Sequence, residues 1–153
     1  MMGRRIVIAT LLLVNSIAVT QACRGPQFEF SIVLDDLTGI DAPVVMQITI
    51  TKMLKNERPQ PDLRVPFDQY DQYVDRFTQL GFARVDKVIR GEWSDPSVVI
   101  AVLPTSCGPY IDAGLSGVVA GSIERNSHGG AVLVPVMESE TTRANRLKKA
   151  SGG

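Results

Sequence analysis

The sequence contains few of the residue types on which most metal sites and hydrolases depend. It has one histidine, His128, and two cysteines, Cys23 and Cys107. These residues cannot form the histidine and cysteine clusters that hold zinc, and the chain lacks the loop pattern of a calcium-binding EF-hand. It also lacks the glycine-flanked serine of a nucleophile elbow. We therefore predict a protein that is not an enzyme and that uses no metal or cofactor.

The single histidine lies in a glycine-rich loop, beside Ser127 in the stretch NSHGG at residues 126–130. A histidine in such a loop is most often an exposed loop residue. A catalytic base would need a nucleophile and an acid that converge on it in space, and no motif predicts such partners. No residue is predicted to be catalytic, and an exported hydrolase with a site near His128 is the least favoured function.

The chain has no excess of charge of either sign, with 16 basic and 16 acidic side chains. No basic stripe runs along any segment, so nucleic acid is not expected as a partner. Asp68, Asp71 and Asp75 recur at three- and four-residue steps, which places them on one face of a helix. A solvated helix face is favoured over a weak calcium site, and the same holds for the other acidic cluster, Asp35-Asp36.

Long hydrophobic runs are absent apart from residues 6–14, which follow Arg4 and Arg5. This run is too short to cross about 30 Å of hydrocarbon well, so a retained transmembrane helix is the weaker interpretation. A small-residue cleavage site ends at Ala22. The pattern predicts a signal peptide over residues 1–22 and a periplasmic or secreted protein without a transmembrane anchor after cleavage.

Cleavage after Ala22 would make Cys23 the first residue of the exported chain. Lipid attachment to Cys23 is disfavoured, because Thr20 and Gln21 do not fit the residues that usually precede a lipidated cysteine. Removal of the signal peptide takes away Arg4 and Arg5 and leaves 14 basic against 16 acidic side chains. The exported chain is predicted to hold one domain, residues 23–138, and a polar tail, residues 139–153.

Two cysteines in an exported chain are expected to pair. A disulfide between Cys23 and Cys107 would close a long loop and contribute about 4–5 kcal/mol in the chain-entropy model. That is a large part of the stability of a small domain. Two unpaired or buried thiols remain the alternative.

Five segments have the alternation or the β-branched composition of strands, and one has the periodicity of an amphipathic helix with a core-facing aromatic stripe. Gly81 is expected to stop this helix, Gly121 to mark a bulge or bend, and Pro135 to lie at an edge or at a strand exit. The tail is predicted either to form a short helix over residues 144–149, capped by the Thr141-Thr142 pair, or to fray. The expected strands are residues 44–53, 82–93, 98–103, 118–123 and 131–137, and the expected helix is residues 67–80.

Five strands without βαβ alternation favour a small barrel over a doubly wound sheet. We expect residues 98–103 to be buried on both faces or to pass through the core, since this run is continuously apolar. The predicted fold class is therefore mainly β: a five-stranded OB-like barrel with one inserted helix, with or without a short C-terminal helix.

The order of these segments resembles the netrin-like module, an OB-type barrel shared with tissue inhibitors of metalloproteinases and with exported bacterial proteins. The similarity lies in VVMQITITKM at residues 44–53, VDKVIRG at 85–91, VVIAV at 98–102, TSCG at 105–108 and VVAGSI at 118–123. Gly114 and Gly117 precede the last of these. The chain departs from the inhibitors in having a single cysteine pair and a helix after the first strand.

The resemblance implies that Cys107 pairs with a cysteine at the mature N-terminus, which here is Cys23. In the inhibitors, the α-amino group and carbonyl of that cysteine chelate the catalytic zinc of the protease. A metalloprotease inhibitor acting through Cys23, with Arg24 as a further contact, is thus one function. The favoured function is a non-enzymatic exported protein that binds a protein or envelope partner through loops at one end of the barrel; this step is an analogy of fold.

Overall fold

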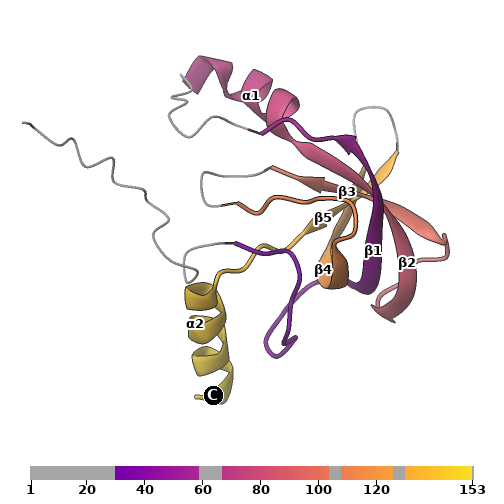
Figure 1. Cartoon of the computed structure of the whole chain (residues 1–153). Helices are drawn as coiled ribbons and strands as arrows, with labels where there is room; N and C mark the ends of the chain where they lie inside the picture. The colour runs from indigo at the N-terminus through magenta and orange to yellow at the C-terminus, as the bar shows by residue number, and fades with distance from the viewer. Residues whose placement is uncertain (1–29, 59–66, 104–107, 126–129, 153) are drawn as a thin grey trace, which may run out of the picture.

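The computed structural model describes residues 30–58, 67–103, 108–125 and 130–152, which form one closed barrel with two helices outside it (Figure 1). The strands follow the order β1-β2-β3-β5-β4, and β4 returns to β1. All neighbours are antiparallel except β3 and β5, which are parallel. The predicted mainly β, five-stranded OB-like barrel is confirmed. The strands are β1 (Val44–Lys55), β2 (Gln79–Arg90), β3 (Ser97–Val102), β4 (Ser116–Arg125) and β5 (Ala131–Pro135).

Strand β1 shows why the barrel closes. Met46, Ile48 and Ile50 alternate with polar residues, so their side chains share one face, and all three are completely buried. The register between β1 and β2 shifts at four places along the pair. Such irregularities bend and twist a strand. A bent β1 can therefore pair with β2 along one side and with β4 along the other.

Two clusters of apolar side chains lie on opposite sides of the barrel wall. The first fills the barrel interior and includes residues from every strand. The second lies on the outer side of β1 and β4, where Val45 and Ala120 are buried although their neighbours point inward. Residues 30–43, which we call the N-terminal arm, cover this outer cluster. The arm is held by a hydrogen bond from the Leu34 amide to the Val118 carbonyl (2.8 Å).

The inserted helix is shorter than predicted. A 3-10 turn (Phe67–Gln69) leads into α1 (Tyr70–Phe77), and β2 begins at Gln79, so the expectation of a helix to residue 80 is wrong. Gly81 is not a helix stop, because it lies within β2 and pairs with Ile100 of β3. Strand pairing on both sides outweighs the local helix pattern there.

Among the aromatic side chains of the helix that the structure describes, the one at its C-terminal end faces the core. Phe77 is buried, whereas Tyr70 is 51% exposed. Figure 1 shows α1 standing above the barrel rather than along its wall. The helix therefore projects from the end of the barrel at which β1 leaves it.

The sequence singles out Pro135 in β5 and Gly121 in β4 as residues that interrupt regular strands. Pro135 is the final residue of β5, as predicted for a strand exit. Gly121 is the residue at which the pairing of β4 passes from β1 to β5, and the register neither shows nor excludes the predicted bulge or bend there. A Cβ at Gly121 would lie 2.2 Å from the Val134 carbonyl oxygen, so glycine is needed here for the close approach of β5.

The polar tail forms α2 (Glu140–Ser151), which confirms the helical alternative and extends it at both ends. Its N-cap is Ser139 rather than the expected threonine pair. The Ser139 hydroxyl accepts from the Thr142 amide, and the Thr142 hydroxyl accepts from the Ser139 amide. This reciprocal capping satisfies two amides at the start of the helix.

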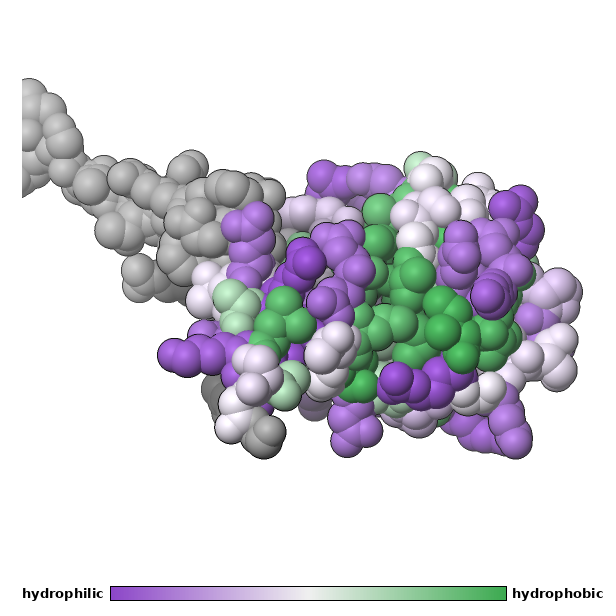
Figure 2. Space-filling view, turned by 90° about the horizontal axis from the view of Figure 1, so that it is seen from below, coloured by the Kyte–Doolittle hydropathy of each residue, from purple (hydrophilic) through white to green (hydrophobic). Residues whose placement is uncertain are grey.

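The outer wall of the barrel is not uniformly polar. In β3 the inward residues are buried, while the outward Val99 and Ala101 are half-buried, so burial on both faces holds only in part. Phe82 of β2 is directly opposite Val99 and is 39% exposed. In the view of Figure 2, hydrophobic residues gather over the barrel and hydrophilic residues surround them.

Candidate partner-binding site

One end of the barrel carries a chain of polar contacts that begins at a buried glutamine. Gln79, the first residue of β2, has no exposed surface. Its Oε1 accepts a hydrogen bond from the Ile111 amide (3.0 Å), and its Nε2 donates to Asn56 Oδ1. Ile111 is itself completely buried and packs into the barrel interior. Gln79 therefore fixes the segment that follows β3 against the residues that follow β1.

The same contacts continue to the surface, where three side chains form what we call the Arg58–Tyr110 cluster: Arg58, Tyr110 and Asp112. Asn56 donates to Asp112 Oδ1 (3.4 Å), and Arg58 Nη2 donates to both Asp112 oxygens (3.2 and 2.9 Å). The Arg58 guanidinium lies 4.8 Å from the centre of the Tyr110 ring. About half of the Arg58 side chain is exposed, and Tyr110 is 38% exposed. The cluster is thus accessible and oriented at the same time.

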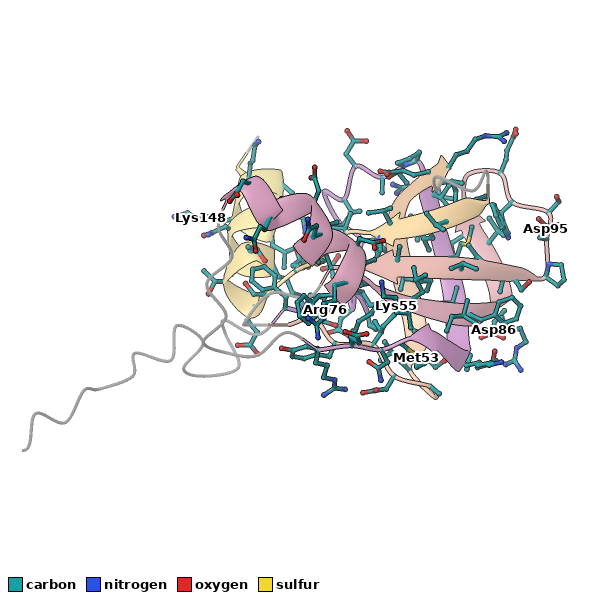
Figure 3. All side chains as sticks on the ribbon, turned by 90° about the horizontal axis from the view of Figure 1, so that it is seen from above. Met53, Lys55, Arg76, Asp86, Asp95 and Lys148 are labelled. Carbon is teal, nitrogen blue, oxygen red and sulfur yellow. The ribbon has the colours of Figure 1, made fainter. Side chains whose placement is uncertain are left out.

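Two further contacts fasten α1 to this end. Lys55 Nζ donates to the Asp75 carbonyl, and Arg76 Nε donates to Glu57 Oε2 (3.0 Å). Figure 3 shows Lys55 and Arg76 close together at the base of the helix, with Asp95 at the opposite end of the barrel. Both contacts join the C-terminal half of α1 to residues 55–57, which precede Arg58 of the cluster. The Arg76–Glu57 ion pair is exposed and contributes little to stability.

A separate polar network lies on the barrel wall. The Thr49 hydroxyl donates to Asp86 Oδ2 (2.7 Å), and Arg84 Nε donates to Asp86 Oδ1 (2.7 Å). These two bonds, with Thr49 the larger cause, lower the pKa of Asp86 below its ordinary value. The network joins β1 to β2, and we assign it a structural role.

The sequence-predicted site residues Cys23, Arg24 and Cys107 lie outside the described residues, as does His128. The structure nevertheless describes the two nearest points of the chain, Phe30 and Gly108. A Cβ added at Gly108 would lie 3.5 Å from the Phe30 carbonyl oxygen. The N-terminal arm therefore begins its described course beside the residue that follows Cys107.

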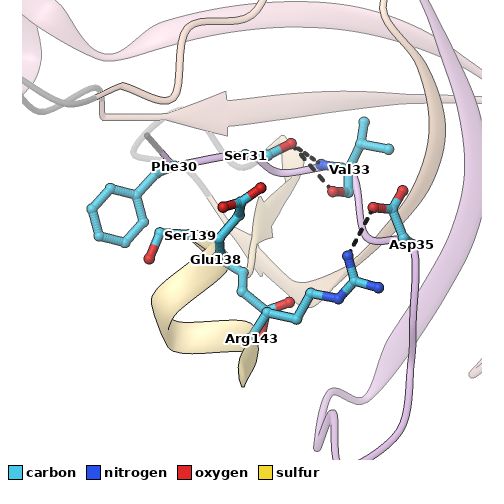
Figure 4. Close-up of a pocket in the computed structure, with 8 residues that line it drawn as sticks. Phe30, Ser31, Val33, Asp35, Glu138, Ser139 and Arg143 are labelled. Carbon is cyan, nitrogen blue, oxygen red and sulfur yellow. Dashed lines mark hydrogen bonds and ion pairs between the residues drawn. The ribbon is translucent and has the colours of Figure 1, made fainter. Parts of the chain in front are cut away.

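A pocket of about 250 Å³ separates the start of the arm from the start of α2 (Figure 4). Arg143 of α2 pairs with Asp35 of the arm across it (3.1 Å). The lining side chains are of mixed charge and include the aromatic ring of Phe30. The residues around the pocket are Phe30, Ser31, Val33, Asp35, Glu138, Ser139, Glu140 and Arg143.

The acidic clusters are not assembled into a metal site in the part of the chain that the structure describes. Asp68, Asp71 and Asp75 are exposed along the 3-10 turn and α1. In the arm, Asp36 Oδ1 accepts a hydrogen bond from the Thr38 amide (2.7 Å), and this bond lowers the pKa of Asp36.

Sequence reasoning did not find Gln79, Arg58, Tyr110 or Asp112. Gln79 was included in the expected helix, and Arg58 lies in a proline-rich stretch that predicts only a loop. Because 54 positions separate Arg58 from Asp112, no local spacing could have connected them.

Comparisons with protein families, with curated proteins and with solved structures find no match to this chain. Within the described ranges, neither helix is long and apolar enough to cross a membrane. The function proposed next therefore depends on the sequence and on the geometry described above.

Proposed function

We propose that this chain is an exported, non-enzymatic binding protein whose OB-like barrel contacts a protein partner through one end. That end consists of residues 56–58, which follow β1, residues 108–115 and the described start of the N-terminal arm at Phe30. The observation that carries the proposal is the Arg58–Tyr110 cluster. In this cluster, exposed side chains are oriented by contacts that reach back to a completely buried Gln79.

The chemistry of the cluster favours a protein surface as its partner. Tyrosine and arginine are enriched among the residues that dominate binding energy at protein interfaces. Side chains that are already oriented lose less conformational entropy when they bind. Buried polar networks are costly unless fully satisfied. This one fixes the segment of Ile111 and also continues to surface side chains that it orients, which supports a function for those side chains.

The test is site-specific photo-crosslinking in the native cell. A photoreactive residue at Ala113, which is exposed beside Asp112, should give one discrete crosslinked partner. The same residue at Gln47, which is exposed on β1, serves as the matched control. Arg58→Ala should abolish the Ala113 product. Equal products from both positions, or a product that survives Arg58→Ala, would count against a binding site at this end.

A metalloprotease inhibitor is the second function, and one observation favours it. The described start of the arm lies against Gly108, which supports a short path from Cys23 to Cys107. A disulfide there would hold the Cys23 amino group and carbonyl rigidly at the same end of the barrel. Rigid presentation of these two groups is what chelation of a protease zinc requires.

Both functions assume a chain that begins at Cys23 and carries the Cys23–Cys107 disulfide. Measurement of the intact mass with and without reductant tests this assumption. The expected result is a chain that begins at an unmodified Cys23 and gains two hydrogens on reduction. An acylated or internal Cys23 would exclude zinc chelation by its amino group. For the inhibitor itself, one alanine inserted before Cys23 should abolish inhibition of a metalloprotease panel, and unchanged potency would refute the mechanism.

A further inference from the structure

The C-terminal helix α2 has little apolar packing, and its half-buried Leu147 is the one large apolar side chain in it. None of its residues is buried. Its sequence is strongly polar, and an isolated polar helix of this length is marginal in water. The helix therefore depends on the contacts that dock it, and the hydrogen bonds and ion pairs among these are described next.

Arg146 supplies most of these contacts. Its Nε and Nη2 donate to the two Glu138 oxygens (2.7 and 2.9 Å), and Nη2 also donates to the Asp36 carbonyl (3.0 Å). Its Nη1 donates to the Thr38 carbonyl. The side chains of Arg146 and Glu138 are only 13% and 10% exposed. Removal of Arg146 would leave the Glu138 carboxylate nearly buried and uncompensated, which is strongly unfavourable.

Glu138 connects this ion pair to the N-terminal arm. Its backbone exchanges two hydrogen bonds with Ser31, from the Ser31 amide to the Glu138 carbonyl (2.8 Å) and in the reverse direction (2.9 Å). The same residue thus holds the arm with its backbone and α2 with its side chain. Because the pocket of Figure 4 separates arm and helix, polar contacts rather than close packing join them there.

We infer that α2 is a clamp that fixes the start of the N-terminal arm through Glu138. When Arg146 is bound, the arm is held at Ser31 and at the turn of residues 36–39. When α2 leaves, the bonds of Arg146 to the turn are lost and the Glu138 side chain loses the partner that holds it, so only the two backbone bonds remain at Ser31. The outer apolar cluster still anchors the middle of the arm. We further infer that release of α2 regulates partner binding, and this part rests on the proposed function. The clamp itself does not depend on the proposed function.

Hydrogen exchange of the full chain, followed by mass spectrometry, tests the clamp. In Arg146→Ala, peptides covering α2 and residues 30–38 should exchange roughly tenfold faster or more, because charged hydrogen bonds are lost. Peptides from β1 and β2 should be unchanged. The matched control is Lys148→Ala. Lys148 is an exposed residue of the same helix and is labelled in Figure 3, so this variant should exchange at the rate of the unaltered chain.

Three results would overturn the inference. Faster exchange in α2 alone would show that the helix does not hold the arm. No change in either segment would show that Arg146 does not dock the helix. Uniformly faster exchange, barrel included, would show that α2 is part of the global folding unit. As a milder variant, Glu138→Gln keeps the backbone bridge and should accelerate exchange of the same two segments by a smaller factor.

The crosslinking assay separates this inference from the proposed function. If Arg146→Ala accelerates exchange in the arm and also reduces the Ala113 crosslink, the clamp and its regulatory role are both supported. If the crosslink persists while exchange accelerates, the clamp stands and its link to partner binding fails. Failure of the proposed function, with no crosslink in the unaltered chain, leaves the exchange result unaffected.

Discussion

At the scale of single residues, Gln79 shows how one polar side chain can organise two loops. It is completely buried, and both ends of its amide are hydrogen-bonded. Buried polar groups that lose their partners destabilise a protein more than the bonds themselves contribute. The position is therefore expected to be sensitive to any substitution.

Gln79→Ala should lower the free energy of unfolding by about 2–3 kcal/mol, since it leaves a cavity and an unpaired Ile111 amide. Urea unfolding measures the change. Gln47→Ala, on an exposed position of β1, is the control and should stay within about 0.5 kcal/mol of the unaltered chain. Equal, small effects at both positions would contradict the assigned role of Gln79.

The lowered pKa of Asp86 predicts that the free energy of unfolding depends on pH. Its folded-state pKa is lower than the ordinary value of 3.8, so its bonds stabilise the fold above pH 3.8. This stabilisation is lost as the pH falls from 3.8 through the lower folded value. Thr49→Val removes the largest cause, so the difference in unfolding free energy from the unaltered chain should shrink as the pH falls through this window.

The matched control for this pH dependence is Thr51→Val on the same strand. The Thr51 hydroxyl donates to the Phe82 carbonyl and not to a carboxylate. Its effect on the unfolding free energy should therefore be the same on both sides of pH 3.8. Parallel pH profiles for Thr49→Val and Thr51→Val would refute the role given to Asp86.

At the scale of secondary structure, the strands were more predictable than the helices. Period-two alternation in β1 is a local property of the chain, so its position could be anticipated closely. The end of α1 could not, because Leu80 and Gly81 continue the helical pattern and yet pair with both neighbouring strands. Pairing with β1 and β3 makes these residues a strand, and the local sequence pattern carries no information about that pairing.

Gly81→Ala should destabilise the protein by about 1–3 kcal/mol, although alanine is the better residue in a regular element. A Cβ there would lie 3.2 Å from Ile111 Cδ1 and 3.3 Å from Ile50 Cγ2, both in the filled barrel. Thermal unfolding measures the effect. Gly152→Ala, where a Cβ meets only the Lys148 carbonyl, should be close to neutral. A neutral Gly81→Ala would show that the core has room to shift.

At the scale of the whole molecule, the barrel is supported from outside by two segments remote in sequence, the N-terminal arm and α2. The arm buries Leu34, Ile40 and Ala42 against the outer wall. Helix α2 is joined to the arm by the Arg143–Asp35 ion pair and by the bonds of Arg146 to two arm carbonyls. This arrangement places Phe30, the described start of the arm, beside Gly108, two residues before Tyr110 of the Arg58–Tyr110 cluster. The predicted disulfide belongs to this scale, since it would connect that arm to the segment after β3.

Reduction of the predicted Cys23–Cys107 disulfide should lower the free energy of unfolding by up to about 4–5 kcal/mol. Denaturant unfolding with and without reductant measures this loss. The double variant Cys23→Ser and Cys107→Ser serves as the control and should not respond to reductant. Identical unfolding of the unaltered chain under both conditions would favour two unpaired thiols.

The sequence by itself determined the five strands, the apolar barrel interior and the mainly β class, because each depends on alternation between near neighbours. Only the tertiary structure decided that Gln79 supports the surface cluster, that Gly81 lies in a strand, and that Arg146 docks α2. These outcomes depend on hydrogen bonds and packing between residues that lie far apart along the chain. Local patterns carry no information about such partners, and barrel closure is what brings them together.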